Sequence, residues 1–117
     1  MARERDPALN ALLGRGAFYS GNLSFEGRVR LDGHFKGRIY TDELLEIGEL
    51  GRLDGEIDAA RVRVAGRVEG VLRVRELLTV ESTGRVYGEI DATEMEVHAG
   101  ATLRATVVSG RGDAEER

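Results

Sequence analysis

The side chains that could do chemistry in this chain are two histidines and many carboxylates. His34 and His98 stand far apart and share no spacing with other ligand-type residues, so we expect surface histidines rather than metal ligands or general bases. The carboxylates occupy positions typical of a solvated surface. Pairs about 5–9 Å apart are common on such surfaces and do not indicate a glycosidase site. We therefore expect no catalytic residue and no enzyme activity.

Cofactor binding has no motif to support it either. The chain contains no cysteine, which excludes disulfides, thiolate metal sites and cysteine nucleophiles. The glycines at positions 14, 16, 48 and 51 do not form the Gly-rich loop with a following Lys-Ser/Thr that holds nucleotide phosphates. We expect no metal, no nucleotide and no other cofactor.

Composition favours a single domain built almost entirely of strands. The 117 residues are enough for one domain, and a net charge of -4 is typical of neither nucleic-acid nor membrane binders. Proline occurs once, at Pro7, and proline is rare in β-ladders because it lacks the N–H donor. No apolar run reaches the about 18 residues of a membrane helix, so we expect a cytoplasmic protein.

An internal repeat defines the elements that position these side chains. An apolar residue, a small residue and a second apolar residue alternate with variable positions, and the small residue recurs every 15 to 18 positions. The six copies are Tyr19-Gly21-Leu23, Phe35-Gly37-Ile39, Leu53-Gly55-Ile57, Val68-Gly70-Leu72, Val86-Gly88-Ile90 and Leu103-Ala105-Val107. Apolar pairs lie between the copies, namely Val29/Leu31, Leu45/Ile47, Val62/Val64, Leu78/Val80 and Met95/Val97.

Both parts of the repeat alternate with a period of two, as strands with one buried face do. The repeat is too short for a propeller blade and suits one coil of a β-helix, whose coils stack at roughly 4.8 Å. We therefore predict an all-β fold, a single parallel β-helix of about six coils over residues 18–108. Residues 1–17 would form a flexible N-terminal tail and residues 109–117 a disordered polar tail.

The small central residue has two interpretations. If every second residue points inward, the glycine faces the core, where a narrow coil has no room for a third large side chain. Alternatively, the glycines are turn residues. We expect the first, because the flanking residues look like strand.

Stacking also predicts rows of like residues on the surface. One row reads His34, Arg52, Arg67, Arg85 and Thr102. It could bind a nucleic acid or a polyanionic wall polymer, or it could be a solvated face whose charges are balanced by neighbouring carboxylates such as Asp54 and Glu69. We favour the solvated face and expect no nucleic-acid partner.

The ends of such a rod expose unpaired backbone and core side chains, and neither terminus offers a convincing cap. Two uncapped ends predict a filament. The candidate polymerisation interface is Tyr19 and Leu23 at one end and Leu103 and Val107 at the other. Leu9, Leu12 and Leu13 are a candidate membrane contact in the N-terminal tail.

Five stretches give the chain a family resemblance: residues 24–33, 35–37, 45–49, 66–70 and 84–90. Together they resemble the bactofilins, bacterial polymer-forming cytoskeletal proteins. The resemblance implies a right-handed, three-sided β-helix that assembles end to end without nucleotide in the bacterial cytoplasm, often near the membrane. It also implies a role in cell shape, wall synthesis or subcellular organisation. Leu103 stands where many members carry a phenylalanine that matters for polymerisation.

Two functional hypotheses follow from the repeat and the resemblance. The leading hypothesis is a structural scaffold whose main partner is itself, with the membrane surface and cell-wall enzymes or other scaffolded proteins as further candidates. The alternative is a non-polymerising β-helix binding module that docks a wall enzyme or polysaccharide on one ladder face. Filaments of the purified protein would separate the two.

Overall fold

The computed structural model describes residues 11–109, which contain nine β-strands and no helix. The strands are β1 (Ala11–Leu13), β2 (Phe18–Phe25), β3 (Val29–Leu31), β4 (His34–Thr41), β5 (Leu44–Ile47), β6 (Arg52–Val64), β7 (Arg67–Val80), β8 (Arg85–Val97) and β9 (Thr102–Ser109). Of the tails expected at residues 1–17 and 109–117, residues 1–10 and 110–117 lie outside the described residues, and Ser109 is the last residue of β9.

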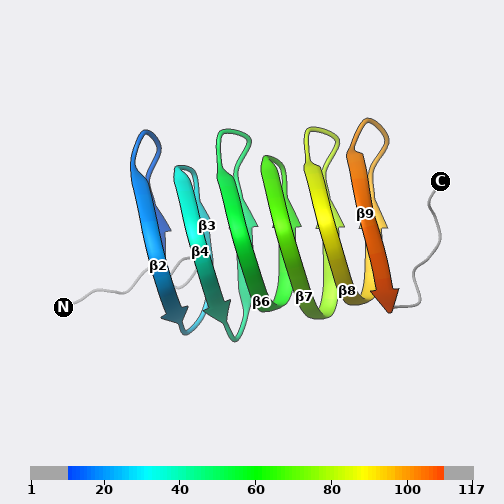
Figure 1. Ribbon diagram of the computed structural model, residues 1–117, viewed down its shortest axis with the longest axis horizontal. Helices are drawn as coiled ribbons and strands as arrows, with labels where there is room; N and C mark the ends of the chain where they lie inside the picture. The colour runs from blue at the N-terminus through cyan, green and yellow to red at the C-terminus, as the bar shows by residue number, and fades with distance from the viewer. Residues whose placement is uncertain (1–10, 110–117) are drawn as a thin grey trace.

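The strands wind into one solenoid, and all strand pairs are parallel. Each coil has a short segment, such as β3, followed by a long one, such as β4, and each segment pairs with its equivalent in the next coil. The long strands β6, β7 and β8 each continue from one coil into the next. In Figure 1 the strands at the front run downward while the chain advances toward the C-terminus, which is a right-handed winding. The predicted right-handed parallel β-helix of about six coils is confirmed.

The register agrees with the predicted repeat residue by residue. Tyr19 pairs with Phe35 and Leu23 with Ile39, and the same correspondence continues through all six copies to Leu103 and Val107. The short segments pair in the predicted way from Val29 and Leu31 onward. Corner lengths differ between coils, but the strands keep their alignment, as expected where surface loops absorb insertions.

The core consists of rows of apolar side chains that stack along the axis. Phe35, Leu53, Val68 and Val86 form one row and have no exposed surface. Burying a side chain of this size stabilises the fold by about 1.5–3 kcal/mol. A further inward row, which the sequence analysis did not identify, contains Thr41, Ala59, Val74 and Ala92. The buried Thr41 hydroxyl donates a hydrogen bond to the carbonyl oxygen of Gly27, so its polar group is satisfied.

The expected role of the central glycines is wrong. Gly37, Gly55 and Gly70 have φ between +134° and +137°, which L-residues rarely adopt, and all three are partly exposed rather than buried. A Cβ placed on any of them would lie 1.9–2.0 Å from the carbonyl oxygen of the glycine in the preceding coil. The glycines therefore bend the long strand into two sides, which gives a three-sided coil, and they let neighbouring coils approach closely. Core width is not the reason for them.

The solenoid begins earlier than the boundary expected at residue 18. Strand β1 lies inside the range assigned to a tail, and it pairs with β3 through Leu13 and Leu31. Leu13 is 9% exposed and belongs to the core. Ala11 and Leu13 thus repeat the short apolar pair one coil before Val29 and Leu31.

Candidate functional site at the two ends of the solenoid

The unpaired strand edges of the described chain lie at its two ends. At the N-terminal end β1 pairs with β3 and β2 pairs with β4, each on one side. At the C-terminal end β9 pairs with β8 on one side, and residues 94–97 of β8 pair with β7. Figure 1 shows these edges at opposite ends of the rod. Such edges present backbone donors and acceptors to another chain.

The N-terminal end exposes part of its core. Tyr19, Leu23 and Phe25 are packed against the core but only partly buried, whereas Phe35 and Ile39, the register partners of the first two, are 0% exposed. The backbone N–H of Gly14 donates to the Tyr19 hydroxyl at 3.2 Å, which orients the ring at the end of the rod.

Phe18 is a further large apolar residue at this end. It is 61% exposed, and its ring packs edge-on against that of His34 at a centroid distance of 4.8 Å. A large aromatic surface of this kind is typical of a position that a partner covers.

The C-terminal end is open in the same way. Met95, Val97, Leu103 and Ala105 are partly buried against the core, and Val107 is 43% exposed. The register partners of Met95, Val97, Leu103 and Val107 one coil earlier are 0% exposed, namely Leu78, Val80, Val86 and Ile90. The change from full to partial burial comes from the missing next coil.

The structure thus places Tyr19 and Leu23 at one end of the rod and Leu103 and Val107 at the other. Phe25, Met95 and Val97 lie beside them and were not among the predicted interface residues. The sequence could have identified Met95 and Val97 as interface residues, because they are the last apolar pair of the repeat. Phe25 could have been found from the inward row that continues through Thr41.

The three leucines of the candidate membrane contact are separated by the structure. Leu13 is buried in the first coil, and Leu12 is 57% exposed. Leu9 lies outside the described residues. Within the described range, no helix is long and apolar enough to cross a membrane.

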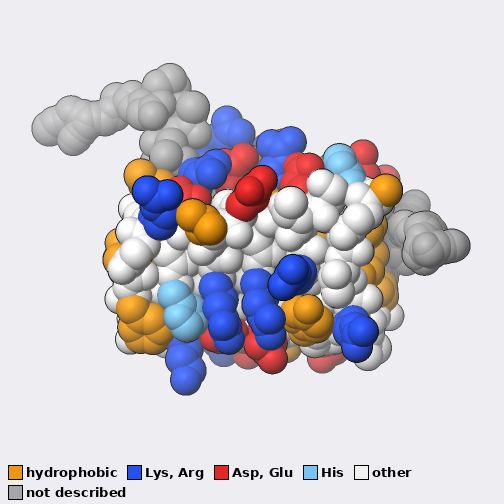
Figure 2. Space-filling model, turned by 90° about the horizontal axis from the view of Figure 1, so that it is seen from above, with side chains coloured by type: hydrophobic (Ala, Val, Ile, Leu, Met, Phe, Trp, Pro, Cys, Tyr) orange, Lys and Arg blue, Asp and Glu red, His pale blue; other side chains and the backbone are white. Residues whose placement is uncertain are grey.

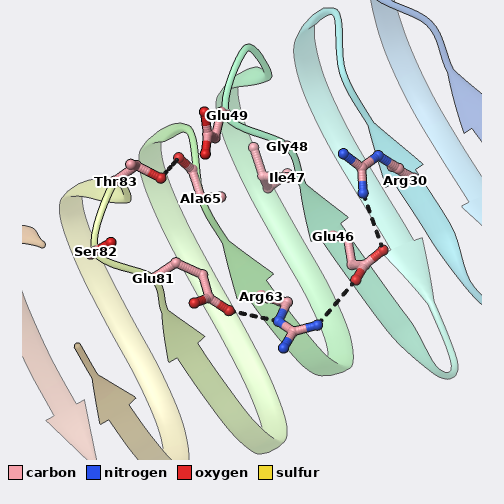
Figure 3. Close-up of a pocket in the computed structure, with 10 residues that line it drawn as sticks. All are labelled: Arg30, Glu46, Ile47, Gly48, Glu49, Arg63, Ala65, Glu81, Ser82 and Thr83. Carbon is pink, nitrogen blue, oxygen red and sulfur yellow. Dashed lines mark hydrogen bonds and ion pairs between the residues drawn. The ribbon is translucent and has the colours of Figure 1, made fainter.

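The side of the rod built from the short segments carries a chain of ion pairs around a shallow hollow of about 340 Å³ (Figure 3). Glu46 lies 3.8 Å from Arg30 and 3.4 Å from Arg63, and Arg63 lies 2.7 Å from Glu81. The hydrogen bond that Arg30 donates to the Asp32 carboxylate raises the pKa of Arg30, and the one that Arg63 donates to the Glu81 carboxylate raises the pKa of Arg63. Because each cation has acidic partners, this side suits coil-to-coil cohesion better than ligand binding.

The arginine row on another side is also accompanied by carboxylates. Arg52 and Arg67 pair in register, and they lie 3.5 Å from Asp54 and 3.6 Å from Glu69 respectively. The Arg67 guanidinium also sits 4.8 Å from the centre of the Tyr87 ring. Figure 2 shows basic side chains beside acidic ones rather than a uniformly basic surface. This arrangement favours the solvated, internally balanced face over a polyanion site.

The two histidines lie on the surface beside carboxylates. The Nε2 atom of His34 is 3.0 Å from an oxygen of Asp54, and His98 lies 3.6 Å from Glu81 and 3.9 Å from Glu96. Among residues 11–109 no group of three or more His, Asp or Glu side chains could hold a metal ion. His34 contacts Asp54 of the next coil and His98 contacts Glu81 of the preceding coil, while Glu96 is a near neighbour of His98 in the sequence.

Comparison with known families matches residues 11–108, nearly the whole described range, to the family described as "Bactofilin: Polymer-forming cytoskeletal". Neither the curated proteins nor the solved structures contain a match. The match begins where β1 begins and ends one residue before β9 ends. The stacked coils, the open ends and this match agree, and the chain belongs to the bactofilin family, a structural cytoskeletal family.

Proposed function

We propose that the protein is a structural subunit that assembles end to end into filaments without nucleotide. The observation that carries this proposal is the contrast between the middle and the ends of the rod. Core rows that are 0% exposed in the middle coils become partly exposed at Tyr19 and Leu23 and again at Leu103 and Val107. Stacking a second molecule on either end would bury these side chains and pair the open edges.

The polymer-forming character of the family supports self-association as the main interaction. The family also suggests cytoplasmic filaments in bacteria, serving cell shape, wall synthesis or subcellular organisation. Such filaments would present the sides of the rod, with their balanced charges, to client proteins. The exposed Leu12, together with Leu9, is the remaining candidate for a membrane contact, since many weak contacts along a filament add up by avidity.

Electron microscopy of the purified protein in negative stain tests the proposal. Filaments should form in plain buffer, and light scattering should be the same with and without ATP or GTP and Mg²⁺. A protein that remains monomeric at all concentrations would contradict the proposal and favour the non-polymerising binding module. A clear nucleotide requirement would contradict the nucleotide independence alone.

A further inference from the structure

The arginines of two middle coils follow a regular pattern of charge pairing. Arg52 lies 3.5 Å from Asp54 in β6, and Arg67 lies 3.6 Å from Glu69 in β7. In both strands the carboxylate follows the arginine by two positions, so the two side chains point to the same side of the strand. The two pairs also stack in register. The positive charge on this side of the rod is therefore balanced in these coils.

This balance ends at β8. Arg85 takes the position of Arg67 in the next coil, but Tyr87 takes the position of Glu69, and Arg104 follows Tyr87 in the last coil. Both Arg85 and Arg104 are exposed. Within the described part of the chain, neither of them forms an ion pair or a side-chain hydrogen bond. The last two coils therefore carry positive charge without the carboxylates that accompany it in β6 and β7.

Another exposed arginine of the rod provides a comparison. Arg73 lies between Asp58 and Asp91 in the register of the neighbouring strands. Opposite charges on adjacent strands stabilise a sheet, and like charges directly opposite each other destabilise it. The register partners of Arg85 are an arginine, Arg67, and a threonine. Arg85 therefore stands beside a like charge, where Arg73 stands between opposite ones.

Arg67 and Tyr87 belong to the same group of side chains. The Arg67 guanidinium lies 4.8 Å from the centre of the Tyr87 ring, a cation–π contact that holds the two together. The Nε–H group of Arg67 is buried and has no acceptor, although buried donors normally have one. Glu69 contacts only a terminal nitrogen of this guanidinium. Arg67 is therefore incompletely satisfied by its carboxylate.

The spacing of the arginines suits a compact anion with two negative charges. Arg85 and Arg104 are one coil and two positions apart, roughly 8 Å between Cα atoms, which is within reach of long side chains. A phosphate monoester carries a charge of about −1.5 to −2 at neutral pH and offers three acceptor oxygens. The planar guanidinium group binds such oxygens in pairs. A phosphate placed here would relieve the repulsion between Arg85 and Arg67.

Two observations narrow the source of the phosphate. A nucleic acid or another long polyanion laid along the arginine row would pass Asp54 and Glu69, and the chain as a whole has a net charge of -4. Small metabolites bind in concave sites that bury most of their surface, whereas Arg85 and Arg104 are exposed. A single phosphate group that projects from a larger partner fits both observations.

We infer that Arg85 and Arg104, with Arg67 and Tyr87 beside them, bind the phosphate group of a phosphorylated partner protein. All four residues belong to one chain, so the site does not depend on filament assembly. A partner that docks here is recruited to the rod when it is phosphorylated and released when the phosphate is removed.

Fluorescence anisotropy with short labelled peptides tests this site. The peptides have a neutral composition and carry phosphoserine, serine or glutamate at one position. The phosphoserine peptide should bind the wild-type protein at low salt, and binding should weaken as salt screens the charges. Inorganic phosphate should compete with it. The serine and glutamate peptides should bind at least about tenfold more weakly, because they lack the dianion.

Arg85→Gln locates the site on the rod. It should weaken binding of the phosphoserine peptide about tenfold or more, since it removes a charge-assisted hydrogen-bond donor. Its circular dichroism and filament formation should match wild type, because the Arg85 side chain has no partner within the described residues. Arg73→Gln is the matched control. It also removes one exposed arginine, but one that lies between two aspartates, and it should bind the peptide like wild type.

Tyr87→Glu provides a second variant that does not remove an arginine. It restores in β8 the carboxylate that Asp54 and Glu69 supply in β6 and β7. The new carboxylate should pair with Arg85 and repel the phosphate, so the phosphoserine peptide should no longer bind while the β spectrum is retained.

Each contrary outcome overturns the inference and leaves the proposed assembly untouched. The inference fails if no phosphoserine peptide binds, or if the glutamate peptide binds equally well. It also fails if Arg85→Gln binds the phosphoserine peptide like wild type. A single-stranded oligonucleotide that binds more tightly than this peptide, and loses affinity with Arg52→Gln, would show that the whole arginine row holds a polyanion instead.

Discussion

Arginine substitutions at Val86 and Leu103, two positions of the same core row, should have different consequences. Val86 has a coil on both sides, whereas Leu103 has a coil on one side only. Val86 pairs in register with Val68 on one side and Leu103 on the other, and it is 0% exposed. Leu103 packs against Val86 on one side and is only partly buried, because no coil of the described chain follows it. Val86→Arg and Leu103→Arg therefore place the same charge in two different surroundings.

The expected losses of folding stability follow from these surroundings. An unpaired guanidinium at position 86 would have to be desolvated inside the rod, which costs several kcal/mol. A domain of this size is stable by about 5–15 kcal/mol, so Val86→Arg should unfold it or come close. At position 103 the charge can reach water, and the monomer should lose only about 1 kcal/mol of one-sided packing.

The penalty for Leu103→Arg should appear on assembly. A partner stacked on the last coil would bury the charge without a counter-ion, at a cost of about 3–5 kcal/mol. Since about 1.4 kcal/mol corresponds to a factor of ten in an equilibrium constant, the critical concentration should rise roughly 100-fold or more.

Sedimentation velocity combined with circular dichroism measures both effects. Leu103→Arg should sediment as a folded monomer at concentrations where wild type forms polymers, and Val86→Arg should lose the β spectrum. Leu103→Arg protein that still forms filaments at the wild-type concentration would show that this end is not a growth interface. A stably folded Val86→Arg protein would contradict the description of the core.

Three further substitutions or truncations test other parts of the account. Gly55→Ala should destabilise the fold by several kcal/mol in urea unfolding, because its Cβ would lie 1.9 Å from the carbonyl oxygen of Gly37; a midpoint equal to wild type would contradict the steric role of the central glycines. Arg63→Ala should change stability by no more than about 1 kcal/mol, and less at high salt, since its ion pairs with Glu46 and Glu81 are solvent-exposed; a large loss in thermal melting would show that the side chain does more than pair charges. Deleting residues 2–10 removes Leu9 and keeps Leu12, so it should leave β1 and the filaments intact but weaken co-sedimentation with liposomes. Wild-type filaments that never bind liposomes would refute the membrane contact.

The strand register could be predicted from the sequence because two independent regularities coincide. Alternation with a period of two indicates which residues face inward, and the repeat of 15 to 18 positions indicates which of them stack. Phe35, Leu53, Val68 and Val86 could therefore be aligned without coordinates, although the corners between them differ in length.

The glycine role could not be predicted in the same way. Alternation assigns Gly37 to the inward face between Phe35 and Ile39, but a positive φ turns its Cβ direction along the rod axis toward Gly21. A pattern of residue types carries no information on the sign of φ. A narrow core and a close contact between coils both predict glycine at this position, so the sequence could not separate the two explanations.

The start of the solenoid was missed for a different reason. Ala11 is small and Leu13 is followed by Gly14 and Arg15, so this pair resembles a polar flank more than a strand. Its spacing from Val29 and Leu31 lies within the range of the repeat and could have identified it. The polymerisation contacts are less accessible to sequence reasoning, because a single chain shows only which core residues lack a neighbour.

The central claim is that filaments consist of these rods stacked along their own axis. In that arrangement the hydrogen bonds between coils run along the filament, and strands lie across it at about 4.8 Å. X-ray diffraction from aligned wild-type filaments measures this directly. The account predicts a strong meridional reflection near 4.8 Å, and a reflection of that spacing on the equator would show that the rods associate side by side instead.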